Sequence, residues 1–98
     1  MNLHTINKTS QHTALYENML SAVSGKDTIL LIEDGVYSAL EAHSGLFQHL
    51  SSDIEILALE ADVSARGLTG KLASYAQVIN DNAFVQRSCE NDKVISWY

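Results

Sequence analysis

Acidic side chains follow two of the apolar runs that the sequence presents as strands. Glu33 and Asp34 come directly after residues 28–32, and Asp62 stands shortly after residues 54–59. Carboxylate oxygens are the ligands that Mg²⁺ prefers, so these acids form one candidate magnesium and phosphoryl site. The alternative is that they cap helices and oppose the positive ends of helix dipoles. We expect the second role, because no lysine follows the last predicted strand.

Cys89 is the one sulfur nucleophile of the chain, and a single cysteine excludes an internal disulfide. Reactivity needs a thiolate, which a helix N-terminus or neighbouring cations would stabilise. The predicted place of Cys89 is near the C-terminal end of a helix, where the dipole disfavours negative charge. Glu90 adds to that effect, and Arg87 and Lys93 offset it only in part. We therefore expect no catalytic cysteine here.

Metal and phosphate motifs are weak in this sequence. The four histidines have no metal-ligand spacing and no paired cysteines to join them; they are His4, His12, His43 and His49. Gly70-Lys71 matches the end of a phosphate-binding P-loop, but Ala65 stands where that loop needs glycine and Leu72 where it needs a hydroxyl. We expect no metal ion and no cofactor. His4, on a strand-like segment, is expected to be hydrogen-bonded and half-buried.

The elements that would position these residues alternate along the chain between strand-like and helix-like patterns. Five short runs rich in β-branched and apolar residues predict strands: 3–6, 28–32, 54–59, 76–79 and 93–97. Helical spacing of Leu15, Met19, Ala22 and Val23 predicts a first helix over 12–24, begun by Thr9-Ser10 and ended by Gly25.

Three shorter helical segments lie between the later strands. Residues 36–40 and 46–50 read as one helix that the polar stretch 41–45 interrupts. Asp62 can begin a short turn that Arg66-Gly67 closes. Asn80 or Asp81 can cap the last helix, whose apolar members include residues 83–85.

This alternation predicts an α/β fold, with a mostly parallel sheet of about five strands and helices on both faces. Ninety-eight residues suit one domain, residues 1–98. Ligands and partners of such sheets meet the carboxyl ends of the strands. The residues to examine there are Asn7, Glu33, Asp34, residues 60–62 and residues 80–81.

The charge balance excludes some partners. Six basic and twelve acidic residues give a net charge of −6, which opposes direct binding of nucleic acid by this chain alone. No apolar run approaches the ~20 residues of a membrane span, and the first residues lack the blocks of a signal peptide. We expect a soluble cytoplasmic protein with no membrane contact.

Several segments in order resemble the TusB/DsrH family over essentially the whole chain. They are Leu3-His4-Thr5, Ile32-Glu33-Asp34-Gly35-Val36, Asp62-Val63-Ser64-Ala65-Arg66-Gly67, Phe84-Val85 and Trp97. The resemblance implies a DsrE-like three-layer α/β/α fold. It also implies a heterohexamer with two related subunits, TusC-like and TusD-like, which handles sulfur as a cysteine persulfide for thiolation of the tRNA wobble uridine.

The resemblance also bears on the role of this subunit. DsrH-type members carry a cysteine in the first helix, and Met19 occupies the corresponding position here. Because a thioether cannot form a persulfide, the chain resembles the TusB branch and is expected to be a non-catalytic subunit that contacts tRNA only through others. Candidate interface or pocket residues are Glu33, Asp34, Gly35, Tyr37, Arg66, Gly67 and Trp97, since arginine and aromatics favour interface centres.

Other functions stay open from the residues alone. The chain could act as a DsrH-like subunit of an intracellular sulfur-oxidation complex, or as a persulfide carrier that uses Cys89. A magnesium-dependent receiver or nucleotide-binding module would instead use Asp34 or Asp62. Without partners, the subunit could associate with itself, because a small core leaves apolar surface to cover.

Overall fold

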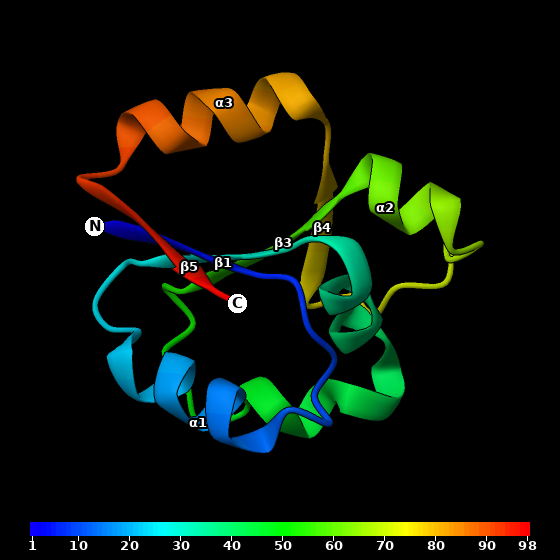
Figure 1. The fold of residues 1–98 in the computed structure, drawn as a ribbon, viewed down its shortest axis with the longest axis horizontal. Helices are drawn as coiled ribbons and strands as arrows, with labels where there is room; N and C mark the ends of the chain where they lie inside the picture. Colours follow the sequence, from blue (N-terminus) through cyan, green and yellow to red (C-terminus); the bar gives the residue numbers. More distant parts are fainter.

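Five parallel strands form one sheet in the order β4-β3-β2-β1-β5 in the computed structural model, which describes residues 1–98 (Figure 1). The strands are β1 Asn2–Ile6, β2 Thr28–Leu31, β3 Glu55–Leu59, β4 Ala76–Ile79 and β5 Lys93–Trp97. All four strand pairings are parallel. Each strand overlaps a predicted run, so the α/β fold with a parallel sheet is confirmed.

The direction of the crossovers determines which face each helix covers. The chain runs from β1 to β4 in one direction across the sheet and then returns to β5 beyond β1. Right-handed crossovers place the first connections on one face and the last on the other. Figure 1 accordingly shows α1 (Thr13–Ala22) on one side of the sheet and α3 (Asp81–Glu90) on the other.

Two apolar clusters fill the faces of the sheet. The larger has 13 buried residues, including Ile6, Ile29 and Ile56 from the strands and Met19 from α1. The smaller consists of Leu3, Leu30, Leu57 and Ile79, against which Ala83 and Phe84 of α3 pack. One ten-residue helix thus covers the second face, and it leaves Val94 of β5 45% exposed.

The first helix differs from its prediction at its start and on its buried face. His12 is the N-cap and no side chain caps the helix, so the expected role of Thr9-Ser10 was wrong. Ala22 is exposed, and Tyr16 is buried instead. The Tyr16 hydroxyl lies 2.7 Å from the Lys8 carbonyl oxygen and 2.7 Å from the Ser38 hydroxyl. These bonds explain why a tyrosine is buried on this face, and burial raises its pKa.

The connection between β2 and β3 is two 3₁₀ helices, η1 (Glu33–Ala39) and η2 (Glu41–Phe47). The predicted interruption at 41–45 was wrong, because the break falls at Leu40 alone. Tyr75 stabilises this break: its hydroxyl lies 2.6 Å from the Ser38 carbonyl oxygen and 2.9 Å from the Leu40 carbonyl oxygen, and its one proton is shared between them. Partial burial there raises the pKa of Tyr75 to about 12.

A capping residue was predicted for each of the last two helices; the first prediction was wrong and the second is confirmed. Helix α2 (Glu60–Ala65) begins two residues before Asp62, whose side chain does not cap it. Asn80 does cap α3, since its Oδ1 accepts the Ala83 N–H at 2.9 Å. Val85 is 63% exposed and is not a core member of α3. No helix is long and apolar enough to cross a bilayer.

Candidate functional site

The carboxyl ends of β1, β2 and β3 bring polar side chains together. Asn7 follows β1, and its Nδ2 donates to Glu33 Oε2 at 3.1 Å. The Glu33 backbone N–H donates to Asp62 Oδ2 at 2.8 Å. Hydrogen bonds that span 26 and 29 residues of sequence thus bring these residues together at one edge of the sheet. We call Asn7, Glu33, Asp34, Asp62 and Arg66 the strand-end cluster.

Arg66 connects the acids of this cluster. Its Nε and Nη2 donate to Asp34 Oδ1 at 3.1 and 2.9 Å, and its Nη1 donates to the Asp62 carbonyl oxygen at 3.3 Å. The Arg66 side chain is 22% exposed and the Asp34 side chain is 61% exposed. These bonds hold the guanidinium between η1 and α2, with part of the side chain open to solvent.

Backbone geometry at the end of β2 makes this arrangement possible. Glu33 has a φ of 50°, a left-handed conformation that is uncommon outside glycine. Gly35, two residues on, is buried, and a Cβ there would lie 2.3 Å from the Ile6 carbonyl oxygen. Gly35 therefore brings η1 against the end of β1 and offers no side chain to a partner.

The chemistry of the cluster is limited by how its acids are engaged. The cluster holds three carboxylates and one guanidinium, which leaves negative charge in excess and opposes phosphate binding. Asp34 accepts from Arg66, and Asp62 accepts from the Glu33 N–H. The structure has no group of three or more His, Cys, Asp or Glu side chains that could hold a metal ion.

The other strand-end residues line a separate hollow. A polar recess of about 430 Å³ lies at the ends of β3 and β4. Its lining residues are Glu60, Ala61, Ser64, Thr69, Asn80 and Asp81. A second recess of about 380 Å³ is more apolar and includes Phe47, Ile54, Ile56 and Tyr75. Residues 80–81 thus do not join the strand-end cluster.

Three further candidate residues lie at different depths. Tyr37 is half-buried and packs against the larger core cluster, while Gly67 is exposed with a φ of +68° beyond α2. Trp97 is half-buried at the end of β5 and also packs against the larger core. The Trp97 indole Nε1–H also donates to His4 Nδ1 at 3.1 Å, so Trp97 belongs to a second polar group, apart from the strand-end cluster.

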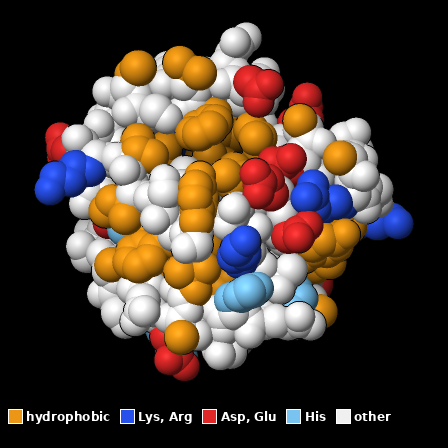
Figure 2. All heavy atoms as spheres, in the orientation of Figure 1, with side chains coloured by type: hydrophobic (Ala, Val, Ile, Leu, Met, Phe, Trp, Pro, Cys, Tyr) orange, Lys and Arg blue, Asp and Glu red, His pale blue; other side chains and the backbone are white.

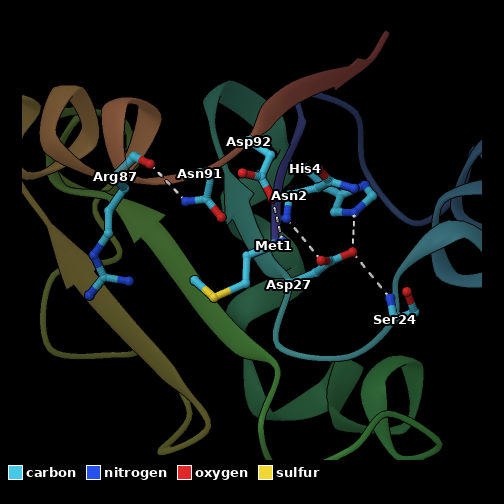
Figure 3. Close-up of polar contacts among 8 residues, drawn as sticks. All are labelled: Met1, Asn2, His4, Ser24, Asp27, Arg87, Asn91 and Asp92. Carbon is cyan, nitrogen blue, oxygen red and sulfur yellow. Dashed lines mark hydrogen bonds and ion pairs between the residues drawn. The ribbon is translucent and has the colours of Figure 1, made fainter.

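The second polar group is centred on Asp27, a buried carboxylate that pairs with His4 and that the sequence analysis did not single out. Asp27, 4% exposed, lies just before β2. Its Oδ1 accepts the Asn2 N–H at 2.9 Å, and its Oδ2 lies 2.9 Å from His4 Nε2 and 3.2 Å from the Ser24 N–H (Figure 3). Burial would raise the pKa of the Asp27 carboxyl, but these hydrogen bonds outweigh burial and the pKa is lowered.

The two sulfur-bearing residues that the sequence analysis singled out, Met19 and Cys89, differ in access. Met19 is fully buried in the larger core. Cys89 is exposed near the C-terminal end of α3, next to Glu90. The Arg87 guanidinium pairs with Glu55 of β3, and that hydrogen bond raises the pKa of Arg87.

The face that carries β5 is mixed in character. Figure 2, in the orientation of Figure 1, shows hydrophobic side chains gathered over its middle, with acidic and basic side chains at one side. Val85, Val94 and Tyr98 are the exposed large apolar side chains of α3, β5 and the residue after it. Apolar surface beside a charged rim is typical of protein interfaces.

Comparisons with known proteins agree with this architecture. Residues 8–94 match the family model described as DsrH like protein. The chain is 33% identical to Protein TusB of Pectobacterium carotovorum over 95 residues, covering 97% of this chain and 99% of the relative. Protein TusB of Yersinia pestis is 32% identical with the same coverage.

A solved structure shows the same fold at much lower sequence identity. The crystal structure of the ychN protein from E. coli matches with a TM-score of 0.73 at 12% identity, and it covers 98% of both chains. The family model and the relatives both span nearly the whole chain. This chain therefore belongs to the DsrH-like protein family.

Proposed function

We propose that this protein is a non-catalytic subunit of a sulfur-relay complex that supports persulfide transfer for 2-thiolation of the tRNA wobble uridine. Its partners in this proposal are two related subunits, TusC-like and TusD-like, in a heterohexamer. The observation that carries the proposal is the match to TusB proteins over nearly the full length of both chains.

The placement of the sulfur atoms supports a role without sulfur transfer. Met19 stands where the resemblance places a cysteine of DsrH-type members, and its side chain fills the core. A thioether there can neither carry a persulfide nor reach a partner. Cys89 is exposed, but it lies near the C-terminal end of α3 beside Glu90 and not at the helix N-terminus that activates cysteines.

The charge of the chain supports an indirect role with tRNA. A net charge of −6 and an acidic strand-end cluster repel a polyphosphate backbone. The same cluster offers a partly exposed guanidinium, and arginine is enriched at protein interfaces, which suits a protein partner. We therefore assign tRNA contact to other subunits and partner contact to this one.

We expect the tagged protein, purified from its own host, to be recovered with two related subunits, one of which carries a reactive cysteine. Native mass spectrometry with peptide identification of each chain measures this. The purified complex is then incubated with a cysteine desulfurase and cysteine, and added sulfur is mapped by mass. Sulfur on the partner and none on Cys89 is the expected result.

Two outcomes would contradict the proposal separately. Recovery of the protein alone as a monomer would contradict the proposal that it belongs to a complex. Recovery of the complex with added sulfur on Cys89, lost in the Cys89→Ser variant, would keep the complex but make this subunit a carrier.

Replacing Arg66 by alanine is expected to weaken recovery of the partners roughly tenfold or more, since arginine at an interface centre can contribute at least ~1–2 kcal/mol. The same change should cost the isolated chain less than about 1 kcal/mol, because exposed ion pairs contribute little. Quantitative pull-down and thermal unfolding measure the two effects.

Arg87→Ala is the matched control for that experiment. Each arginine of the chain pairs with a half-exposed or exposed carboxylate, Arg66 with Asp34 and Arg87 with Glu55. Only Arg66 belongs to the strand-end cluster. Equal loss of partners in both variants, or none in Arg66→Ala, would show that this cluster is not the interface.

A further inference from the structure

Strand β5 is an edge strand of the sheet, and we call it the C-terminal edge. Strand β5 pairs with β1 alone, from Asn2↔Lys93 to Ile6↔Trp97. Beyond it, Tyr98 is 64% exposed. Trp97 is therefore the last side chain of the strand that packs against the core.

A hydrogen bond from Trp97 determines the tautomer of a buried histidine. The indole Nε1–H can only donate, and it lies 3.1 Å from His4 Nδ1. His4 Nδ1 must therefore carry a free lone pair. The ring proton is assigned to Nε2, which donates to Asp27 Oδ2 at 2.9 Å. His4 is fully buried, so water does not replace either partner.

We propose that His4 is a proton-operated latch for the C-terminal edge of the sheet. A proton taken from solvent binds the lone pair of Nδ1, and the neutral ring becomes an imidazolium. Nδ1 and the Trp97 indole then present two donors to each other at hydrogen-bonding distance with no acceptor between them. The indole must move away, and the end of β5 loses its bond to the core.

The surroundings of His4 direct this change toward Trp97. On its other side the imidazolium keeps its bond to the Asp27 carboxylate and forms a buried ion pair. The side chains level with His4 in the neighbouring strands are Ile29 and Ile95, which carry no charge.

The remaining charged and titratable groups nearby are already paired or point outward. The Met1 ammonium pairs with Asp92 before β5, and Lys26, in the turn before β2, is exposed. On α1, the hydroxyl of Tyr16 is bonded to Lys8 and Ser38. The indole is the one hydrogen-bond partner of Nδ1 in the structure, so the loss falls on the indole.

The test is a pH titration followed by NMR, in which one tryptophan gives one indole signal. At neutral pH we expect His4 to be the Nε2–H tautomer and the Trp97 indole proton to be protected. On acidification, the indole signal should shift with the same midpoint as the His4 ring nitrogens. Its exchange with solvent, relative to the intrinsic exchange rate of an indole at each pH, should become about tenfold faster, which is the effect of losing one such hydrogen bond.

The His4→Gln variant separates the latch from general acid effects. A glutamine amide can donate to Asp27 and accept from Trp97 but takes up no proton in this range. We expect its indole signal to stay constant where the wild-type signal moves. In the control variant His49→Gln, which changes an exposed histidine, the Trp97 indole signal should move with pH as it does in wild type.

Three results would overturn the latch. One is an Nδ1–H tautomer at neutral pH, and another is an indole signal that stays unchanged while His4 titrates. The third is a His4 that remains neutral until the whole protein unfolds. If His4→Gln does not fold, Trp97→Phe replaces it: the latch predicts that His4 then binds its proton at a higher pH.

Discussion

Replacing Asp27 by asparagine is expected to destabilise the protein by about 2 to 3 kcal/mol, because a buried donor loses its acceptor. The carboxylate accepts three hydrogen bonds, from the Asn2 and Ser24 N–H groups and from His4. An amide has one oxygen and one NH₂ group. In either orientation, its NH₂ group faces at least one of these donors in a site closed to water.

The effect of this substitution depends on pH with a defined sign. The pKa of Asp27 is lowered in the folded protein from its ordinary value of 3.8. The carboxylate therefore contributes its full stability above that value and loses it as pH falls through the folded pKa. We expect the difference between wild type and Asp27→Asn to be constant near neutral pH and to narrow in acid below about pH 4.

Chemical unfolding at several pH values measures this difference, and thermal unfolding checks it. Each kcal/mol should lower the midpoint by about 4 to 8 °C in a domain of this size. Asp53→Asn is the control, because Asp53 is exposed and its side chain makes no hydrogen bond in the structure. A gap that does not narrow below about pH 4, or equal stability of the two variants, would contradict the role assigned to Asp27.

The strands were predictable because each is a short apolar run with its own turn signals. Residues 76–79 and 93–97 match β4 and β5 residue for residue. Their parallel order follows from the alternation with helices, and one local cap, that of Asn80, follows from residue type alone. These features depend on neighbours in the sequence, which is why the sequence can reveal them.

The polar contacts that organise the sites could not be predicted in the same way. Asp62 was expected to cap its own helix, but its carboxylate accepts an N–H from Glu33, 29 residues away. His4 and Asp27 are 23 residues apart, and His4 and Trp97 are 93 apart. Such pairs arise from strand register, and the type of each residue alone does not indicate its partner. The one usable signal was a histidine within a predicted strand.

The close approach at Gly35 connects the fold to the strand-end cluster. The Gly35 N–H donates to the Ile32 carbonyl oxygen at 2.8 Å, and the Ile32 N–H donates to the Ile6 carbonyl oxygen at 3.1 Å. A Cβ added to Gly35 would lie only 2.3 Å from the same Ile6 oxygen, which is too close for unbonded atoms. A side chain here would push η1 away from the end of β1, where Asn7 and Glu33 meet.

Gly35→Ala is therefore expected to destabilise the protein by about 2 to 3 kcal/mol, near the upper end of the cost of overpacking a core. The Cβ would lie 2.3 Å from the Ile6 carbonyl oxygen and 3.2 Å from its carbon, both backbone atoms that cannot rotate aside. Thermal and chemical unfolding measure the loss. Because the displaced segment carries Glu33 and Asp34, recovery of partner subunits should fall as well.

Gly45→Ala provides the matched control, since the nearest atom to its Cβ is a flexible Gln48 side-chain nitrogen at 3.8 Å. It should leave stability unchanged or raise it by about 0.4 to 1 kcal/mol, because alanine restricts the unfolded chain. If Gly35→Ala behaves like Gly45→Ala, η1 has room to move at the end of β1. The strand-end cluster would then be held by its hydrogen bonds alone, and Arg66→Ala would be expected to destabilise the isolated chain more than an exposed ion pair allows.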